Sequence, residues 1–198
     1  ATAKTIADAL GYEVLPANGS SIVSRYRIVN ALTNGHSRGV TVEISPGQRV
    51  HLFNCHLKPY PYGPYDLKKG RSREFVIKQE HETRMPALTE LLAAMRPSVS
   101  GPEPVFLVGD FNAPSHFDYA DVPWPTSIAC TNAGLADAYH ELHRTNRKFP
   151  PQFKLDEPGI TWTPRPDQEP EGVFDRIDFV YYSVGDGVTV VGANELDA

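Results

Sequence analysis

Val105-Phe106-Leu107-Val108-Gly109-Asp110-Phe111-Asn112 is the stretch that decides the fold of this 198-residue chain. Its four leading apolar residues are typical of a buried strand. Because side chains alternate along a strand, Asp110 and Asn112 are expected on the same side. One anionic and one neutral oxygen ligand together suit a hard divalent ion such as magnesium. A turn in which both side chains satisfy backbone N–H groups explains the same two residues without a metal.

Two other stretches share this pattern of an apolar strand with polar groups at one end. The first places Asn54 and His56 on one face of an expected interior strand, and the second places Arg176 and Asp178 on one face of another. Each has a structural explanation, namely a core histidine bonded to backbone and an ion pair between Arg176 and Asp178. Three strands that all carry such groups indicate a shared site more strongly than any one of them.

These stretches resemble the signatures of the endonuclease/exonuclease/phosphatase superfamily, and they occur in the order of that family. The segments that carry the resemblance are Asn54-Cys55-His56-Leu57, Gly109-Asp110-Phe111-Asn112, Thr161-Trp162-Thr163-Pro164 and Asp175-Arg176-Ile177-Asp178-Phe179. The resemblance runs from about Ile6 to Val191. It implies a four-layer α-β-β-α sandwich of the deoxyribonuclease I-like type, whereas the residue pattern alone indicates only an α/β protein.

Family members also carry segments that have no counterpart here. They begin with a strand bearing an asparagine and a second strand ending in Gln-Glu, whose glutamate is the principal metal ligand, and they finish with Ser-Asp-His. This sequence instead opens on an expected helix closed by Gly11, and no Ser-Asp-His follows Asp178. We therefore expect residues 1–198 to form a single domain that is incomplete at both ends and poorly active in isolation.

The resemblance implies a divalent-metal-dependent hydrolase of phosphoric esters, similar to a phosphodiesterase or a nuclease, that uses Mg²⁺ or Mn²⁺. The implied catalytic residues are His56, Asp110, Asn112 and Asp178, of which Asp110 and Asn112 are the expected metal ligands. The expected substrate-binding residues are Arg176, Tyr62, Tyr65 and Trp162. The alternative is a non-catalytic module that binds phosphate or a protein on the same scaffold. For the tyrosines, packing of the rings against the body is an equal alternative to substrate contact.

Composition sets limits on the partners. The net charge of −5 and the pI near 5.8 do not favour nucleic acid, although a metal cluster and a local arginine patch could hold a phosphodiester. No stretch approaches the roughly 20 apolar residues of a membrane span. Two cysteines give no disulfide framework. The sequence leaves open the oligomeric state, the choice among DNA, RNA, phospholipid and inositol phosphate substrates, and the compartment, with secretion an option if a signal peptide lies outside this chain.

Local patterns predict the elements around the site. We expect strands over 21–28 and 38–45, and helix over 72–96 in which Pro86 either kinks the helix or opens a second one. We expect a further helix over 127–144 that is interrupted near Gly134, and an irregular surface insertion over 150–170. His81, His140 and His143 are expected to be solvated on helix surfaces.

Overall fold

The computed structural model describes residues 2–16, 21–34, 37–119, 121–143, 159–162, 173–185 and 187–193. The helices are α1 (Ala3–Leu10), α2 (Gly63–Lys68), α3 (Arg73–Thr83), α4 (Met85–Val99), α5 (Pro125–Asn132) and α6 (Ala138–His143). The strands are β1 (Glu13–Leu15), β2 (Ile22–Ser24), β3 (Arg27–Asn34), β4 (Ser37–Ser45), β5 (Gln48–His56), β6 (Val105–Asp110), β7 (Leu135–Asp137) and β8 (Asp178–Ser183). The α/β class expected from the sequence is confirmed. Most of the expected insertion over 150–170 lies outside the described residues.

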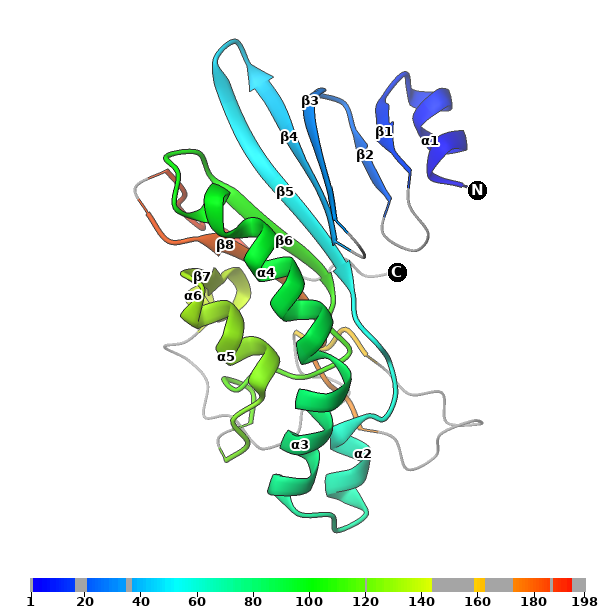
Figure 1. Ribbon diagram of the computed structural model, residues 1–198, viewed down its shortest axis with the longest axis vertical. Helices are drawn as coiled ribbons and strands as arrows, with labels where there is room; N and C mark the ends of the chain where they lie inside the picture. Colours follow the sequence, from blue (N-terminus) through cyan, green and yellow to red (C-terminus); the bar gives the residue numbers. More distant parts are fainter. Residues whose placement is uncertain are drawn as a thin grey trace.

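A six-stranded sheet is the centre of the fold, and its strand order is β3-β4-β5-β6-β8-β7. Strands β5 and β6 are parallel, whereas β8 is antiparallel to β6. The final residues of β5 and β6 therefore meet the first residue of β8 at one edge of the sheet. The chain passes from β5 to β6 through α2, α3 and α4, and α1 with the two-stranded sheet β1–β2 lies beyond β3 (Figure 1).

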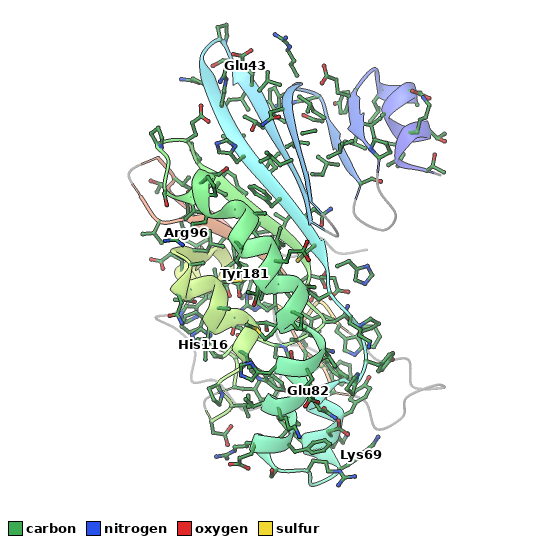
Figure 2. All side chains as sticks on the ribbon, viewed as in Figure 1. Glu43, Lys69, Glu82, Arg96, His116 and Tyr181 are labelled. Atoms are coloured by element: carbon green, nitrogen blue, oxygen red, sulfur yellow. The ribbon has the colours of Figure 1, made fainter. Side chains whose placement is uncertain are left out.

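One face of the sheet packs against α4 and α5, and this contact forms the main core. Strand alternation places every second residue of β5, β6 and β8 on that face, and α4 contributes one apolar stripe. The buried members are Phe53, Cys55, Leu57, Leu88, Leu91, Met95, Val105, Leu107, Phe111, Cys130, Leu135, Phe179 and Tyr181. Tyr181 is labelled in Figure 2, where Glu43 and Lys69 mark opposite ends of the molecule.

Helix ends follow from the residues at them. Ser72 begins α3 by accepting a hydrogen bond from the Phe75 N–H at 3.2 Å. Pro86 opens α4 in its first turn, which decides between the two alternatives for this proline. Gly11 closes α1 with φ 67°, as expected for a glycine cap. None of the described helices is long and apolar enough to cross a membrane.

Two expected elements differ in part from the structure. The strand over 21–28 is divided at residues 25 and 26 between β2 and β3, which belong to different sheets. The helix over 127–144 is interrupted at Gly134 as expected, since this residue follows α5 with φ 86°, but the next three residues form strand β7 and pair with β8 before α6 begins. His81 is exposed as expected. His140, however, stacks on Phe117 with ring centroids 3.7 Å apart, and His143 lies 3.1 Å from the Ala193 carbonyl, so neither is simply solvated.

Candidate active site

His56, Asp110 and Asp178 lie together at the edge where β5 and β6 end and β8 begins. In the strand register His56 is opposite Asp110, and Asp110 is opposite Asp178. The His56 Nε2 and Asp110 Oδ2 atoms are 3.7 Å apart, which is longer than a hydrogen bond but close enough for an ion pair with a protonated imidazole. The side chains are 52% exposed for His56 and 29% for Asp110, and Asp178 is exposed as well. The three groups are therefore adjacent and open to solvent.

Gly109 makes this convergence possible. Its φ is 143°, a backbone conformation that side-chain-bearing residues rarely adopt. A Cβ atom at this position would overlap the carbonyl group of Cys55 on the neighbouring strand. The glycine thus lets β6 approach β5 closely just before Asp110.

Asn112 joins the ends of β5 and β6. Its backbone N–H donates to Asp110 Oδ1 at 2.7 Å, and its side-chain Nδ2 donates to the Leu57 carbonyl at 2.8 Å. Its φ of 50° is left-handed, which asparagine tolerates better than most residues. The turn considered in the sequence is therefore present, with Asp110 Oδ1 engaged in it. The other carboxylate oxygen, Oδ2, is the one nearer to His56.

Asp178 is positioned by Thr161. The Thr161 hydroxyl oxygen accepts hydrogen bonds from the backbone N–H groups of Ile177 and Asp178, each at 3.0 Å. Thr161 in turn is held by its own backbone N–H, which donates to the Asp175 carbonyl at 3.1 Å. The first residue of β8 thereby has a fixed backbone although its side chain is exposed.

The electrostatics of the site concentrate on Asp110. Partial burial raises the pKa of this carboxyl, and the Asn112 backbone N–H opposes that effect by stabilising the carboxylate. The neighbouring Asp178 carboxylate raises the Asp110 pKa further, whereas His56 and Arg84 lower it. Two carboxylates side by side repel each other, and a bound cation would relieve that repulsion.

The donor set fits one mode of magnesium binding and not another. Among the described residues, no group of three His, Cys, Asp or Glu side chains is arranged to hold a metal ion. Asp110 and Asp178 nevertheless form an adjacent, accessible pair of carboxylates. Magnesium is usually held by one or two carboxylates together with water and substrate phosphate, and not by an all-protein cage. The pair fits that open arrangement.

Arg176 is a correction to the sequence prediction. It was expected to contact substrate, with an ion pair to Asp178 as the alternative, but it is only 2% exposed and its partners are Asp118 and Asp137. Its Nη1 donates to Asp137 Oδ1 at 2.8 Å, and its Nε donates to Asp118 Oδ2 at 3.1 Å. These two carboxylates raise the pKa of Arg176 against the effect of burial. The guanidinium is buried and paired with these two carboxylates.

Tyr62 is a second correction. Its ring is 6% exposed and its hydroxyl donates to Asp175 Oδ2 at 2.6 Å, so packing against the body is the alternative that holds for this residue. Tyr65 and Trp162 are half-buried beside it, and Trp162 Nε1 donates to the Tyr65 hydroxyl at 3.3 Å. The ring of this loop that reaches solvent most is Tyr60, which is 54% exposed.

Some buried residues that support the site were not expected from the sequence. Asp175, which is fully buried, accepts hydrogen bonds from the hydroxyls of Tyr62 and Tyr119. Arg84 and Glu80 pair inside the protein. A signal for this pair was available, because Val76, Glu80, Arg84 and Leu88 share one helical stripe. Charged residues at positions where a helix carries apolar ones are informative.

The chain matches the model of the Endonuclease/Exonuclease/phosphatase family over residues 11–196. An uncharacterized protein of Caenorhabditis elegans is 27% identical over 188 residues, with 82% of this chain and 57% of that protein covered. The chain thus spans little more than half the length of this curated relative.

Three solved structures share the fold. The 3′ phosphatase NExo from Neisseria, bound to a product DNA hairpin, has a TM-score of 0.58 and 16% identity over 90% of this chain and 69% of its own. The human Nocturnin catalytic domain with bound sulfate has a TM-score of 0.54 and 17% identity over 91% and 63%. Beta toxin from Staphylococcus aureus with bound magnesium ions has a TM-score of 0.50 and 16% identity over 82% and 51%. Together with the family match, the ordered motifs and their meeting at one sheet edge lead to one conclusion: this chain belongs to the Endonuclease/Exonuclease/phosphatase family.

Proposed function

We propose that this protein hydrolyses phosphoric esters with the help of a divalent metal ion, Mg²⁺ or Mn²⁺. The observation that carries the proposal is the meeting of His56, Asp110 and Asp178 at one accessible edge of the sheet. Solved structures of the same fold include a 3′ phosphatase and a toxin with bound magnesium ions. This supports the reaction class, while the substrate of this chain is left to experiment.

Asp110 and Asp178 would hold the metal ion, with the side-chain oxygen of Asn112 as a further ligand. Such an ion polarises a phosphoryl oxygen and stabilises the leaving oxygen. Asp110 Oδ2 would orient an attacking water and accept its proton. His56 Nε2 would donate a hydrogen bond to a phosphoryl oxygen as negative charge develops on it. Tyr65 and Trp162 are the proposed contacts to the rest of the substrate.

The test is a substrate panel of DNA, RNA, phospholipid and a simple phosphodiester, assayed with magnesium and with chelator. We expect turnover that chelator abolishes, at the low rate expected of residues 1–198 in isolation. Asp110→Asn should lower that turnover by at least ~100-fold, the low end for a general acid–base group, and leave the fold intact. Asp8→Asn is the matched control, since Asp8 lies on α1 and pairs with Lys4.

Turnover that survives Asp110→Asn, or that chelator does not affect, would contradict the mechanism. Binding of phosphate compounds without turnover would instead favour the alternative of a non-catalytic phosphate-binding module. The net charge makes nucleic acid a less favoured substrate. Equal rates on DNA and on a simple phosphodiester would therefore contradict the expectation that is based on charge.

A further inference from the structure

A buried arginine lies behind the loop that follows His56. Arg84 is fully buried between α3 and α4, on the stripe that continues as Leu88 in the core. Arginine is almost never fully buried unless it is paired. Its partners therefore indicate what this side chain does.

Arg84 forms hydrogen bonds both with Glu80 of α3 and with the loop that follows β5. Its Nη1 donates to Glu80 Oε1 at 2.5 Å. Its Nη2 donates to the backbone carbonyls of Pro59 at 2.8 Å and of Pro61 at 2.9 Å. These two carbonyls lie on either side of Tyr60, so one guanidinium fixes the backbone before and after that residue.

We use the term strap for residues 57–62, the segment between the end of β5 and α2. The strap is fastened at both of its ends as well. Leu57 donates its N–H to the Asp110 carbonyl at 2.9 Å and accepts from Asn112 at 2.8 Å. Tyr62 donates its hydroxyl to Asp175. Arg84 therefore supplies the attachment at the middle of the strap.

The composition of the strap explains why a side chain must hold it. Pro59 and Pro61 have no N–H group and cannot join a strand ladder, yet their carbonyls still need donors. The planar, multidentate guanidinium meets this need better than an ammonium group, because its donors are fixed in a fork. The arrangement leaves the exposed side chains of Lys58 and Tyr60 on the outside of the strap.

The Glu80–Arg84 pair is weak evidence for a purely stabilising role. Burial raises the pKa of Glu80 to about 7, against the opposing effect of Arg84. Removal of two charges from water is costly, and apolar replacements of buried ion pairs are often neutral or stabilising. Because Arg84 of this pair also holds the strap next to the site, we explain the buried pair by that contact.

We propose that Arg84 is a positioning residue: it clamps the strap so that His56, which directly precedes the strap, keeps a fixed place beside Asp110. This inference rests on the proposed hydrolysis for its kinetic part. The same clamp fixes the backbone on both sides of Tyr60, whose side chain is exposed.

The experiment compares Arg84→Met, Arg84→Lys and the double variant Glu80→Leu/Arg84→Met with the wild-type protein. The double variant removes both buried charges, so we expect it to unfold at the same denaturant concentration as the wild type. Arg84→Lys keeps a charge beside Glu80 but lacks the fork for both carbonyls. Arg96→Met is the matched control, because Arg96 is exposed near the end of α4.

Two readouts report on the strap without any need for turnover. Fluorotyrosine NMR follows Tyr60, assigned with Tyr60→Phe, and ring NMR of labelled histidine follows His56, assigned with His56→Gln. We expect both resonances to shift or broaden in the double variant and in Arg84→Lys, and to stay unchanged in Arg96→Met. Unchanged resonances in the folded double variant would overturn the proposal.

The kinetic readout is kcat and KM on the simple phosphodiester. A displacement of about 1 Å can cost about 100-fold in rate, so we expect a loss of that order in kcat for the double variant, with a smaller change in KM. A folded double variant with displaced resonances but wild-type kcat would refute the positioning role. If the wild-type protein shows no turnover, the proposed function fails, while the two resonances still decide whether Arg84 holds the strap.

Discussion

Gly109 occupies a position that fits glycine and no larger residue. Its φ of 143° favours glycine, and a Cβ would overlap the Cys55 carbonyl group. We expect Gly109→Ala to lower the free energy of unfolding by more than the roughly 1–3 kcal/mol of backbone strain alone, as measured by urea unfolding.

Gly11→Ala separates the two effects at Gly109. Gly11 also has a positive φ, 67°, but a Cβ there would meet nothing within 4 Å. This variant should show the cost of strain without overlap. Equal losses at the two positions would mean that the close approach of β5 and β6 does not constrain residue 109.

Single residues show how far the sequence could predict the site. Asp110, His56 and Asp178 could be placed together, because strand alternation and motif order are local properties of the chain. The sequence does not indicate that Arg176 and Tyr62 are buried, since polar residues near these motifs carry no local sign of burial. Their partners are distant in the sequence: Arg176 pairs with Asp118 and Asp137, and Tyr62 pairs with Asp175. Long-range pairing was therefore the missing information.

At the scale of elements, the buried Asp175 ties the entry of β8 to two loops through Tyr62 and Tyr119. Burial raises its pKa from 3.8 to about 6, although both hydroxyls oppose this effect. A carboxyl with a raised folded-state pKa stabilises the fold below its unfolded pKa and loses that contribution as pH rises through the folded value. The difference corresponds to about 3 kcal/mol.

We therefore expect the free energy of unfolding of the wild type to fall by about 3 kcal/mol as the pH rises from below 4 to above 6. Asp175→Asn should not show this fall. Urea unfolding at a series of pH values measures it. Asp121→Asn, at an exposed carboxylate, controls for general charge effects. Parallel pH profiles for wild type and Asp175→Asn would contradict the assignment.

Arg176 joins β7, the entry of β8 and the loop after β6 through its two carboxylate partners. Arg176→Met leaves Asp118 and Asp137 buried without a cation. We expect a loss of about 3–5 kcal/mol in unfolding free energy, measured by chemical denaturation. The same substitution at Arg73, whose pair with Asp121 is exposed, should cost less than about 1 kcal/mol. Similar losses at both positions would show that burial of the Arg176 cluster has no energetic weight.

The elements themselves were predictable where local chemistry decides them. Pro86 and the apolar stripe located α3 and α4, and Gly11 located the end of α1. Strand β7 was missed because Leu-Ala-Asp carries no strand signal, and it pairs only because β8 offers an edge there. The division between β2 and β3 was missed for a similar reason, since the sheet that each joins depends on distant strands.

At the scale of the whole molecule, charge and donor number predict weak metal binding by the 198-residue chain. The chain carries a net charge of −5, but Asp110 and Asp178 are the two carboxylates that its described residues bring to the site. We expect calorimetric titration to show weak magnesium binding, weakened further by Asp178→Asn and unchanged by Asp8→Asn. Tight binding, or no effect of Asp178→Asn, would show that other groups hold the ion.

The parallel pairing of β5 with β6 has a consequence for the order in which the residues of the candidate site come together. Strands β3, β4 and β5 are joined by short connections and can form from neighbouring chain, whereas β6 must wait for the crossover through α2, α3 and α4. Contacts that close such a long loop carry a large entropic cost and form slowly. His56 meets Asp110 only after this closure, and Asp178 comes from later still in the chain. A partly folded chain can therefore hold much of its secondary structure before His56, Asp110 and Asp178 lie together.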